Sequence, residues 1–99
     1  MYVIREIMYC KPGKVGELAK KFKQLVPLMK EQGMTNPPRV MTDFTGEQFW
    51  TIVWEQDVES LDKYVEMMRQ GPSDPRAQQI MAGYHDLVVS GKREIFKLE

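Results

Sequence analysis

The segment Phe49-Trp50-Thr51-Ile52-Val53-Trp54 constrains the fold of this chain more than any other stretch. Its β-branched and aromatic residues favour a β-strand, in which alternate side chains point to opposite faces. Trp50, Ile52 and Trp54 then share one face, while Phe49 and Val53 share the other. A chain of 99 residues has too few helices to cover two apolar sheet faces. The second face therefore predicts another protein surface, most simply a second copy in a homodimer.

Length and charge set the class of protein. The 99 residues predict one domain, 1–99, of ordinary soluble composition, with 42% hydrophobic and 28% charged residues. Lys+Arg and Asp+Glu number 14 each, so we expect neither a nucleic-acid nor a membrane partner.

Cysteine usage and the N-terminus indicate the compartment. Cys10 is the single cysteine, which excludes an intrachain disulfide and a thiolate metal site within one chain. The first residues lack the pattern of a signal peptide, and no segment approaches the roughly 20 apolar residues of a membrane span. A cytoplasmic location is the expectation.

Changes in hydrophobic period mark the expected elements. Strands are predicted at 2–10, 39–45, 48–55 and 93–98. A first helix is predicted at 14–32, with a kink at Pro27 and a stop at Gly33. A second is predicted at 58–70, with Asp57 as its cap and an inner face of Val58, Leu61, Val65 and Met68. After a break at 71–75, a third helix is predicted from Pro75 to about Leu87, with Asp74 as its cap. The order β-α-β-β-α-(α)-β is typical of the ferredoxin-like α+β fold, a four-stranded antiparallel sheet with helices on one face.

Three motifs resemble those of a known superfamily. They are Tyr9-Cys10-Lys11-Pro12-Gly13-Lys14, Leu25-Val26-Pro27-Leu28 with Gly33, and Thr51-Ile52-Val53-Trp54-Glu55. Together, and over almost the whole chain, they resemble the dimeric α+β barrel proteins, which include antibiotic-biosynthesis-monooxygenase-like domains, haem-degrading monooxygenases and NIPSNAP-like proteins. The resemblance implies a homodimer through sheet faces and a ligand cleft between each subunit's sheet and its helices.

Three aromatic residues are candidate ligand contacts. Trp54 lies where the resemblance implies a pocket tryptophan, and an indole can stack on a flat ligand while donating one hydrogen bond. Tyr64 and Tyr84 carry hydroxyls that can orient a polar ligand. The alternative for Trp54 is a place in the core under the helices.

Glu6 and His85 are the candidate catalytic residues. Alternation puts Glu6 on a face with Ile4 and Met8, where desolvation would raise the pKa of a carboxyl toward general-base range. The alternative is an ion pair or an exposed edge position. His85 is the only histidine and can shuttle protons or bind haem. The resemblance, however, would place a haem ligand near Ile80, so His85 is alternatively a surface or dimer-rim residue.

The sequence therefore supports three hypotheses of function. The first is an apolar, aromatic-lined cleft in a cofactor-independent monooxygenase-like protein acting on a small aromatic compound. The second is a dimer that binds a ligand or partner without catalysis, and the third is a haem-binding protein. No motif predicts a cofactor or metal site in the first two cases.

Overall fold

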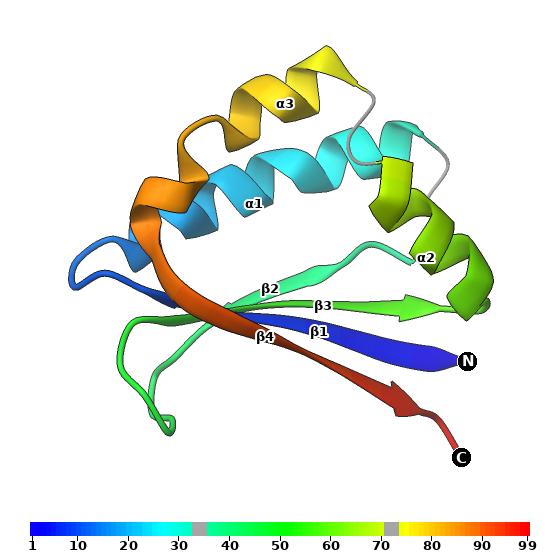
Figure 1. Ribbon diagram of the computed structural model, residues 1–99, viewed down its shortest axis with the longest axis horizontal. Coiled ribbons are helices and arrows are strands. Elements are labelled where there is room, and N and C mark those ends of the chain that lie inside the picture. The colour runs from blue at the N-terminus through cyan, green and yellow to red at the C-terminus, as the bar shows by residue number, and fades with distance from the viewer. Residues whose placement is uncertain (33–35, 71–73) are drawn as a thin grey trace.

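The computed structural model of the protein, which describes residues 1–32, 36–70 and 74–99, has a four-stranded antiparallel sheet with its helices on one face (Figure 1). The elements are β1 (Tyr2–Cys10), α1 (Val15–Glu31), β2 (Arg39–Thr42), β3 (Thr51–Val58), α2 (Leu61–Gln70), α3 (Pro75–Met81), the 3₁₀ turn η1 (Tyr84–Leu87) and β4 (Val88–Lys97). This order confirms the predicted ferredoxin-like α+β fold.

Strand β1 lies in the middle of the sheet, whose order is β2-β3-β1-β4. It pairs antiparallel with β3 on one side and β4 on the other, and this register places Glu6 opposite both Trp54 and Arg93. Residues directly opposite each other in antiparallel strands share a face. Glu6, Trp54 and Arg93 therefore lie together on the face that the helices cover.

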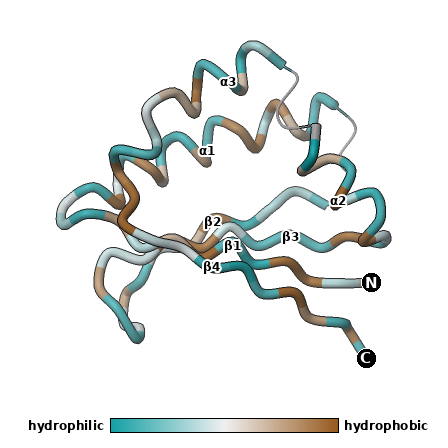
Figure 2. Tube along the Cα trace, in the orientation of Figure 1, coloured by the Kyte–Doolittle hydropathy of each residue, from teal (hydrophilic) through white to brown (hydrophobic). Residues whose placement is uncertain are grey.

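The core forms where α1 packs on this covered face. Leu18 and Phe22, one helical turn apart, are buried against the sheet together with Ile52. The ring of Phe22 meets Trp54 edge-on, with centroids 5.2 Å apart. Figure 2 shows apolar positions alternating with polar ones along α1, as expected of a helix with one buried face. In the described ranges, no helix is long and apolar enough to span a membrane.

Strand β3 differs from its predicted position of 48–55. It begins at Thr51 and continues to Val58, because residues 55–58 pair with the start of β1. The predicted helix start at residue 58 and its Asp57 cap are therefore wrong; α2 begins at Leu61, and the Ser60 hydroxyl accepts from the backbone N–H of Lys63.

The aromatic residues before β3 do not extend it. Trp50 has φ 61°, a left-handed conformation that breaks the strand, and its side chain is 39% exposed. Phe49 is 85% exposed. The prediction that Trp50 shares one strand face with Ile52 and Trp54 is wrong. Trp54, 8% exposed, lies in the core, which was the alternative to a ligand contact. Residues 43–50 instead form a loop that projects from the sheet on the side away from the helices (Figure 1).

The helices also depart from the sequence pattern in detail. Within residues 61–69 of α2, Tyr64 is buried, while Val65 and Met68, predicted to point inward, are about half exposed. The third helix ends at Met81, because Gly83 at φ 80° starts a separate 3₁₀ turn. The Asp74 cap is confirmed, since its side chain accepts from the Arg76 backbone N–H. The predicted stop at Gly33 and the break at 71–73 lie outside the described residues.

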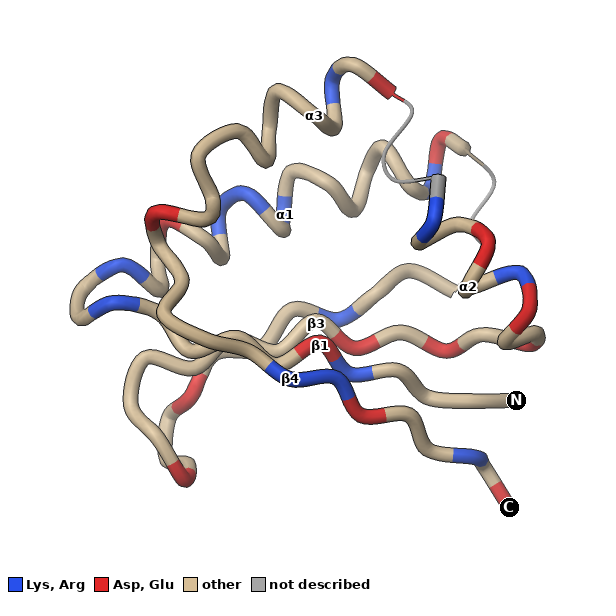
Figure 3. The backbone as a smooth tube through the Cα atoms, in the orientation of Figure 1, with Lys and Arg blue, Asp and Glu red and all other residues tan. Residues whose placement is uncertain are grey.

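The face of the sheet away from the helices, here called the open face, carries charge at its centre. Glu55 is only 6% exposed and accepts from Arg5 Nε at 2.6 Å and from the Arg39 guanidinium. The Arg39 hydrogen bond and, to a lesser extent, Arg5 hold the pKa of Glu55 below its usual range against the opposing effect of burial. Figure 3 shows charged residues gathered along the middle of β1, β3 and β4. The open face is therefore mixed rather than apolar throughout.

Candidate ligand-binding site

A cavity of about 480 Å³ lies between the end of β3, the C-terminal part of α1 and the first turns of α2. Its volume falls in the range of small-molecule sites, roughly 300–1,000 Å³. The described residues that line it are Met29, Gln32, Asn36, Gln56, Asp57, Val58, Glu59, Ser60, Lys63, Tyr64 and Met67. The cleft predicted between sheet and helices is thus present, but its lining mixes apolar and polar groups and includes one aromatic residue, Tyr64, rather than being apolar and aromatic.

The floor of the cavity contains a buried amide. Gln56 is only 5% exposed, and its Oε1 accepts a hydrogen bond from Trp54 Nε1 at 2.7 Å. The two residues are two apart in β3 and so share the covered face. Gln56 Nε2 is buried without a hydrogen-bond partner among the described residues. An unpaired buried donor costs about 1–3 kcal/mol, so this group calls for an explanation.

Tyr64 connects the cavity to the charged centre of the covered face. It donates to Glu6 Oε1 at 2.5 Å, and Arg93 Nε donates to the same oxygen at 2.5 Å. The Arg93 guanidinium also lies 5.8 Å from the centroid of the Tyr64 ring. Glu6 is thereby an ion-paired carboxylate whose Oε1 is occupied by two donors, and Tyr64 is the member of the cluster that lines the cavity.

The Tyr64 hydroxyl is held in its neutral form. Burial raises its pKa first, and the hydrogen bond to Glu6 and the charge of that carboxylate raise it further, while Arg93 lowers it. A phenol in this state donates a hydrogen bond throughout the physiological range. It can pass a proton toward Glu6 but cannot itself act as a phenolate base.

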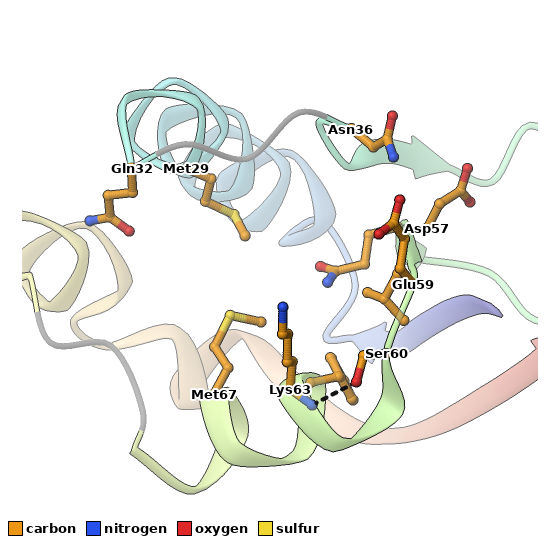
Figure 4. A pocket seen from close by; sticks show the side chains of 11 residues that line it. Met29, Gln32, Asn36, Asp57, Glu59, Ser60, Lys63 and Met67 are labelled. Carbon is orange, nitrogen blue, oxygen red and sulfur yellow. Dashed lines mark hydrogen bonds between the residues drawn. The ribbon is translucent and has the colours of Figure 1, made fainter. Parts of the chain in front are cut away.

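The outer part of the cavity combines sulfur and charge (Figure 4). The side chains of Met29 and Met67 point toward one another from α1 and α2, and the Lys63 side chain extends into the space beside them. Asp57, near the end of β3, and Glu59, just after it, lie at the rim. Methionine side chains adapt to ligands of irregular shape, so this part favours an apolar body.

The other predicted site residues lie elsewhere. Trp54 packs in the core and reaches the cavity only through Gln56. Tyr84 and His85 stand in η1 with ring centroids 4.0 Å apart, and neither lines the cavity. The backbone N–H of Lys11 bonds to Leu87, which places η1 beyond the end of β1. Glu6 lies five residues before Lys11, roughly 17 Å along a strand at about 3.3 Å per residue. Glu6 and Tyr64 are thus brought together, while His85 is separated from them.

Sequence reasoning missed Gln56 and Lys63. The sequence pattern assigned the strand's end to residue 55 and a helix cap to Asp57, which removed Gln56 from the covered face. Lys63 was placed correctly on a helix, but no local pattern indicated that it would reach a cavity. The missed signal was the alternation itself, because Ile52, Trp54, Gln56 and Val58 continue the period of two through a polar residue.

The elements and their order define the class of the protein as a ferredoxin-like α+β domain with a cleft between its sheet and its helices. No protein-family model and no curated protein matches the sequence. Among solved structures, the chain is similar to an uncharacterised NIPSNAP domain protein from Burkholderia xenovorans, with TM-score 0.77 and 15% identity over 100% of this chain and 95% of the other.

Two further structures show the same likeness. A NIPSNAP family protein of unknown function from Agrobacterium tumefaciens superposes with TM-score 0.79 and 18% identity, over 99% of this chain and 87% of the other. A protein from Deinococcus radiodurans, provisionally assigned as an antibiotic biosynthesis monooxygenase, superposes with TM-score 0.68 and 12% identity, over 100% and 93%. These likenesses confirm the fold.

Proposed function

We propose that this protein is a homodimeric, cytoplasmic domain that binds a small, partly apolar molecule in the cavity between β3, α1 and α2. The observation that carries the proposal is the buried, unpaired Nε2 of Gln56 at a cavity of about 480 Å³. The amide oxygen serves Trp54, but the unpaired amide N–H group destabilises the fold while no ligand is bound. A ligand with a hydrogen-bond acceptor would satisfy the amide when bound.

A matched pair of cavity-filling variants tests this proposal. Met67 lines the cavity, whereas its neighbour Met68 does not, and both are about half exposed on α2. We expect compounds that raise the melting temperature in a fragment screen to lose their effect on Met67→Trp and to keep it on Met68→Trp. Hits that persist on Met67→Trp, or a diverse screen without any hit, would contradict a binding site in this cavity.

The homodimer is proposed to form through the open face. Three apolar residues lie directly across the strands from one another there, namely Ile7, Val53 and Met41. They line a pocket of about 270 Å³ beside the loop of residues 43–50, and Phe44 of this loop is fully exposed. Exposed apolar surface of this kind is typical of protein interfaces.

Light scattering tests the dimer directly. We expect the wild-type protein to have twice the 11.6 kDa mass of one chain. Val53→Asp should yield monomer, because it places a charge on the open face, and Val65→Asp on the exposed side of α2 should remain dimeric. A monomeric wild type, or equal effects of the two variants, would refute the interface.

A second candidate function is cofactor-independent oxygenation, and the Glu6–Tyr64 hydrogen bond favours it. A bound aromatic substrate that loses a proton would reduce O₂ itself, with one oxygen atom replacing two hydrogens of the substrate and the other leaving as water. Tyr64, which lines the cavity, would relay the proton to Glu6. An oxygen electrode with anthrone-like substrates should record consumption that Tyr64→Phe abolishes; no consumption by the wild type leaves binding as the function.

A further inference from the structure

The orientation of the Gln56 amide is fixed by its neighbour. Trp54 Nε1 is a donor only, so the atom 2.7 Å from it must be the amide oxygen. Turning the amide over would bring two donors together and leave the oxygen without the indole bond. Nε2 is therefore held as a donor, and this buried atom of a cavity-lining residue lacks an acceptor.

A lysine side chain, that of Lys63, lines the same cavity. Lys63 lies in the first turn of α2 and its side chain extends into the space (Figure 4). In the parts of the chain that are described, its ammonium group has no ion pair. Two acidic residues, Asp57 and Glu59, line the cavity as well. The charge of Asp57 also acts on Arg39, which lies on the neighbouring strand β2, so that Asp57 is partly balanced there.

We infer that the cavity takes a small apolar carboxylic acid. Its carboxylate accepts from Gln56 Nε2 and pairs with Lys63 Nζ, and its apolar body lies between Met29 and Met67. This inference rests on the proposed binding function and names the ligand class for it. Tyr64 does not compete for the carboxylate, because its hydroxyl already donates to Glu6.

Three probes of equal length separate the carboxylate from the rest of the ligand. They are 4-phenylbutyrate, the neutral 4-phenylbutyramide and the cationic 4-phenylbutylamine, titrated into ¹⁵N-labelled protein while the Gln56 side-chain amide resonance is followed. We expect the acid to shift this resonance and to bind about tenfold more tightly than the amide, with the amine weakest. The amide retains a carbonyl acceptor but exchanges the second oxygen for a neutral NH₂ group, so the difference between acid and amide reports the loss of that anionic oxygen.

Two variants assign the contacts. Lys63→Met should weaken the acid about tenfold and leave the amide unchanged, whereas Lys23→Met, which removes an exposed lysine of α1 outside the cavity, should change neither. Gln56→Glu keeps an acceptor for Trp54 but replaces the donor with a carboxylate. It should abolish binding of the acid and strengthen binding of the amine, with folding checked by circular dichroism.

The outcomes distinguish this inference from the function on which it rests. If the acid and the amide bind equally, if Lys63→Met has no effect, or if the acid fails to shift Gln56 at about 10 mM, the carboxylate class is refuted. The binding function stands in each of these cases if fragments of other chemistry bind to wild type and lose binding on Met67→Trp. Only the absence of any such fragment refutes the binding function as well.

Discussion

The Trp54–Gln56 pair allows a quantitative test of the unpaired amide. Gln56→Met removes the orphaned donor, which relieves about 1–3 kcal/mol, but leaves the buried indole N–H without its acceptor, which costs a similar amount. The two effects oppose each other. We therefore expect the free energy of unfolding of Gln56→Met to lie within about 1 kcal/mol of wild type in the absence of ligand, although the residue is buried.

Trp54→Phe should behave very differently. It removes the indole donor, so that both polar atoms of Gln56 become unpaired, and it leaves a space beside Phe22. An unpaired acceptor costs about 1–3 kcal/mol, and a large-to-small change in the core adds to it. We expect a total loss of about 2–5 kcal/mol.

The double variant Trp54→Phe/Gln56→Met measures the interaction free energy between Trp54 and Gln56. It contains neither polar partner, so only the packing loss remains. Its free energy of unfolding should exceed the value obtained by adding the two single-variant effects by at least about 2 kcal/mol. Urea unfolding of the ligand-free protein measures all four free energies. Additivity within about 0.5 kcal/mol would refute the pair as the only hydrogen bond of this amide. A loss above about 3 kcal/mol for Gln56→Met alone would show that Nε2 is already satisfied.

Two further predictions concern Glu55 in β3 and Trp50 just before it. Arg39 and Arg5 lower the pKa of Glu55, so its stabilising effect is present above the unfolded value of about 4.5 and is lost as the pH falls through the lower folded value. The acid limb of a stability–pH curve should therefore be shallower in Glu55→Gln, and an unchanged limb would contradict the pairing. Trp50→Gly should be less destabilising than Trp50→Ala in urea unfolding, because glycine adopts φ 61° without strain, and the reverse order would contradict the left-handed conformation.

The fold was predictable because its main signals are periodic. The apolar spacing of α1 and the alternation of β1 identify their elements from a single sequence, and the order of elements then leaves few topologies. The boundaries around β3 were not predictable from the local pattern. Trp50 has high strand propensity but a left-handed conformation, and residues 55–58 are strand because β1 pairs with them.

The candidate site was predicted in part. The alternation grouped Glu6 with Ile4 and Met8, and Trp54 with Ile52, and the register brings these two groups onto one face. The pattern could not show which residue of α2 would reach Glu6. That depends on the angle at which α2 crosses the sheet, which turns Tyr64 inward and Val65 outward. The importance of Gln56 was also hidden, because only the three-dimensional structure reveals that one of its two polar atoms has no partner.

The hydrogen bond between Tyr64 and Glu6 leads to a last prediction, on proton occupancy. Burial and the adjacent carboxylate raise the pKa of Tyr64, so it should be the last tyrosine to ionise when ¹³C-labelled tyrosines are titrated by NMR. Its neutral form stabilises the fold fully below the unfolded value of about 10, and this stabilisation is lost as the pH rises through the folded value. Tyr64→Phe identifies the resonance by removing it.

Glu6→Gln separates the two causes of this shift. The variant keeps an oxygen to accept from Tyr64 but removes the negative charge, so the pKa of Tyr64 should fall toward that of the other tyrosines while remaining above it, because burial is the larger cause. If Glu6→Gln leaves the titration unchanged, Glu6 and Tyr64 do not share a hydrogen bond in solution. The proton relay of the oxygenase candidate would then lose its first step, whereas binding at Gln56, which does not involve Glu6, would be unaffected.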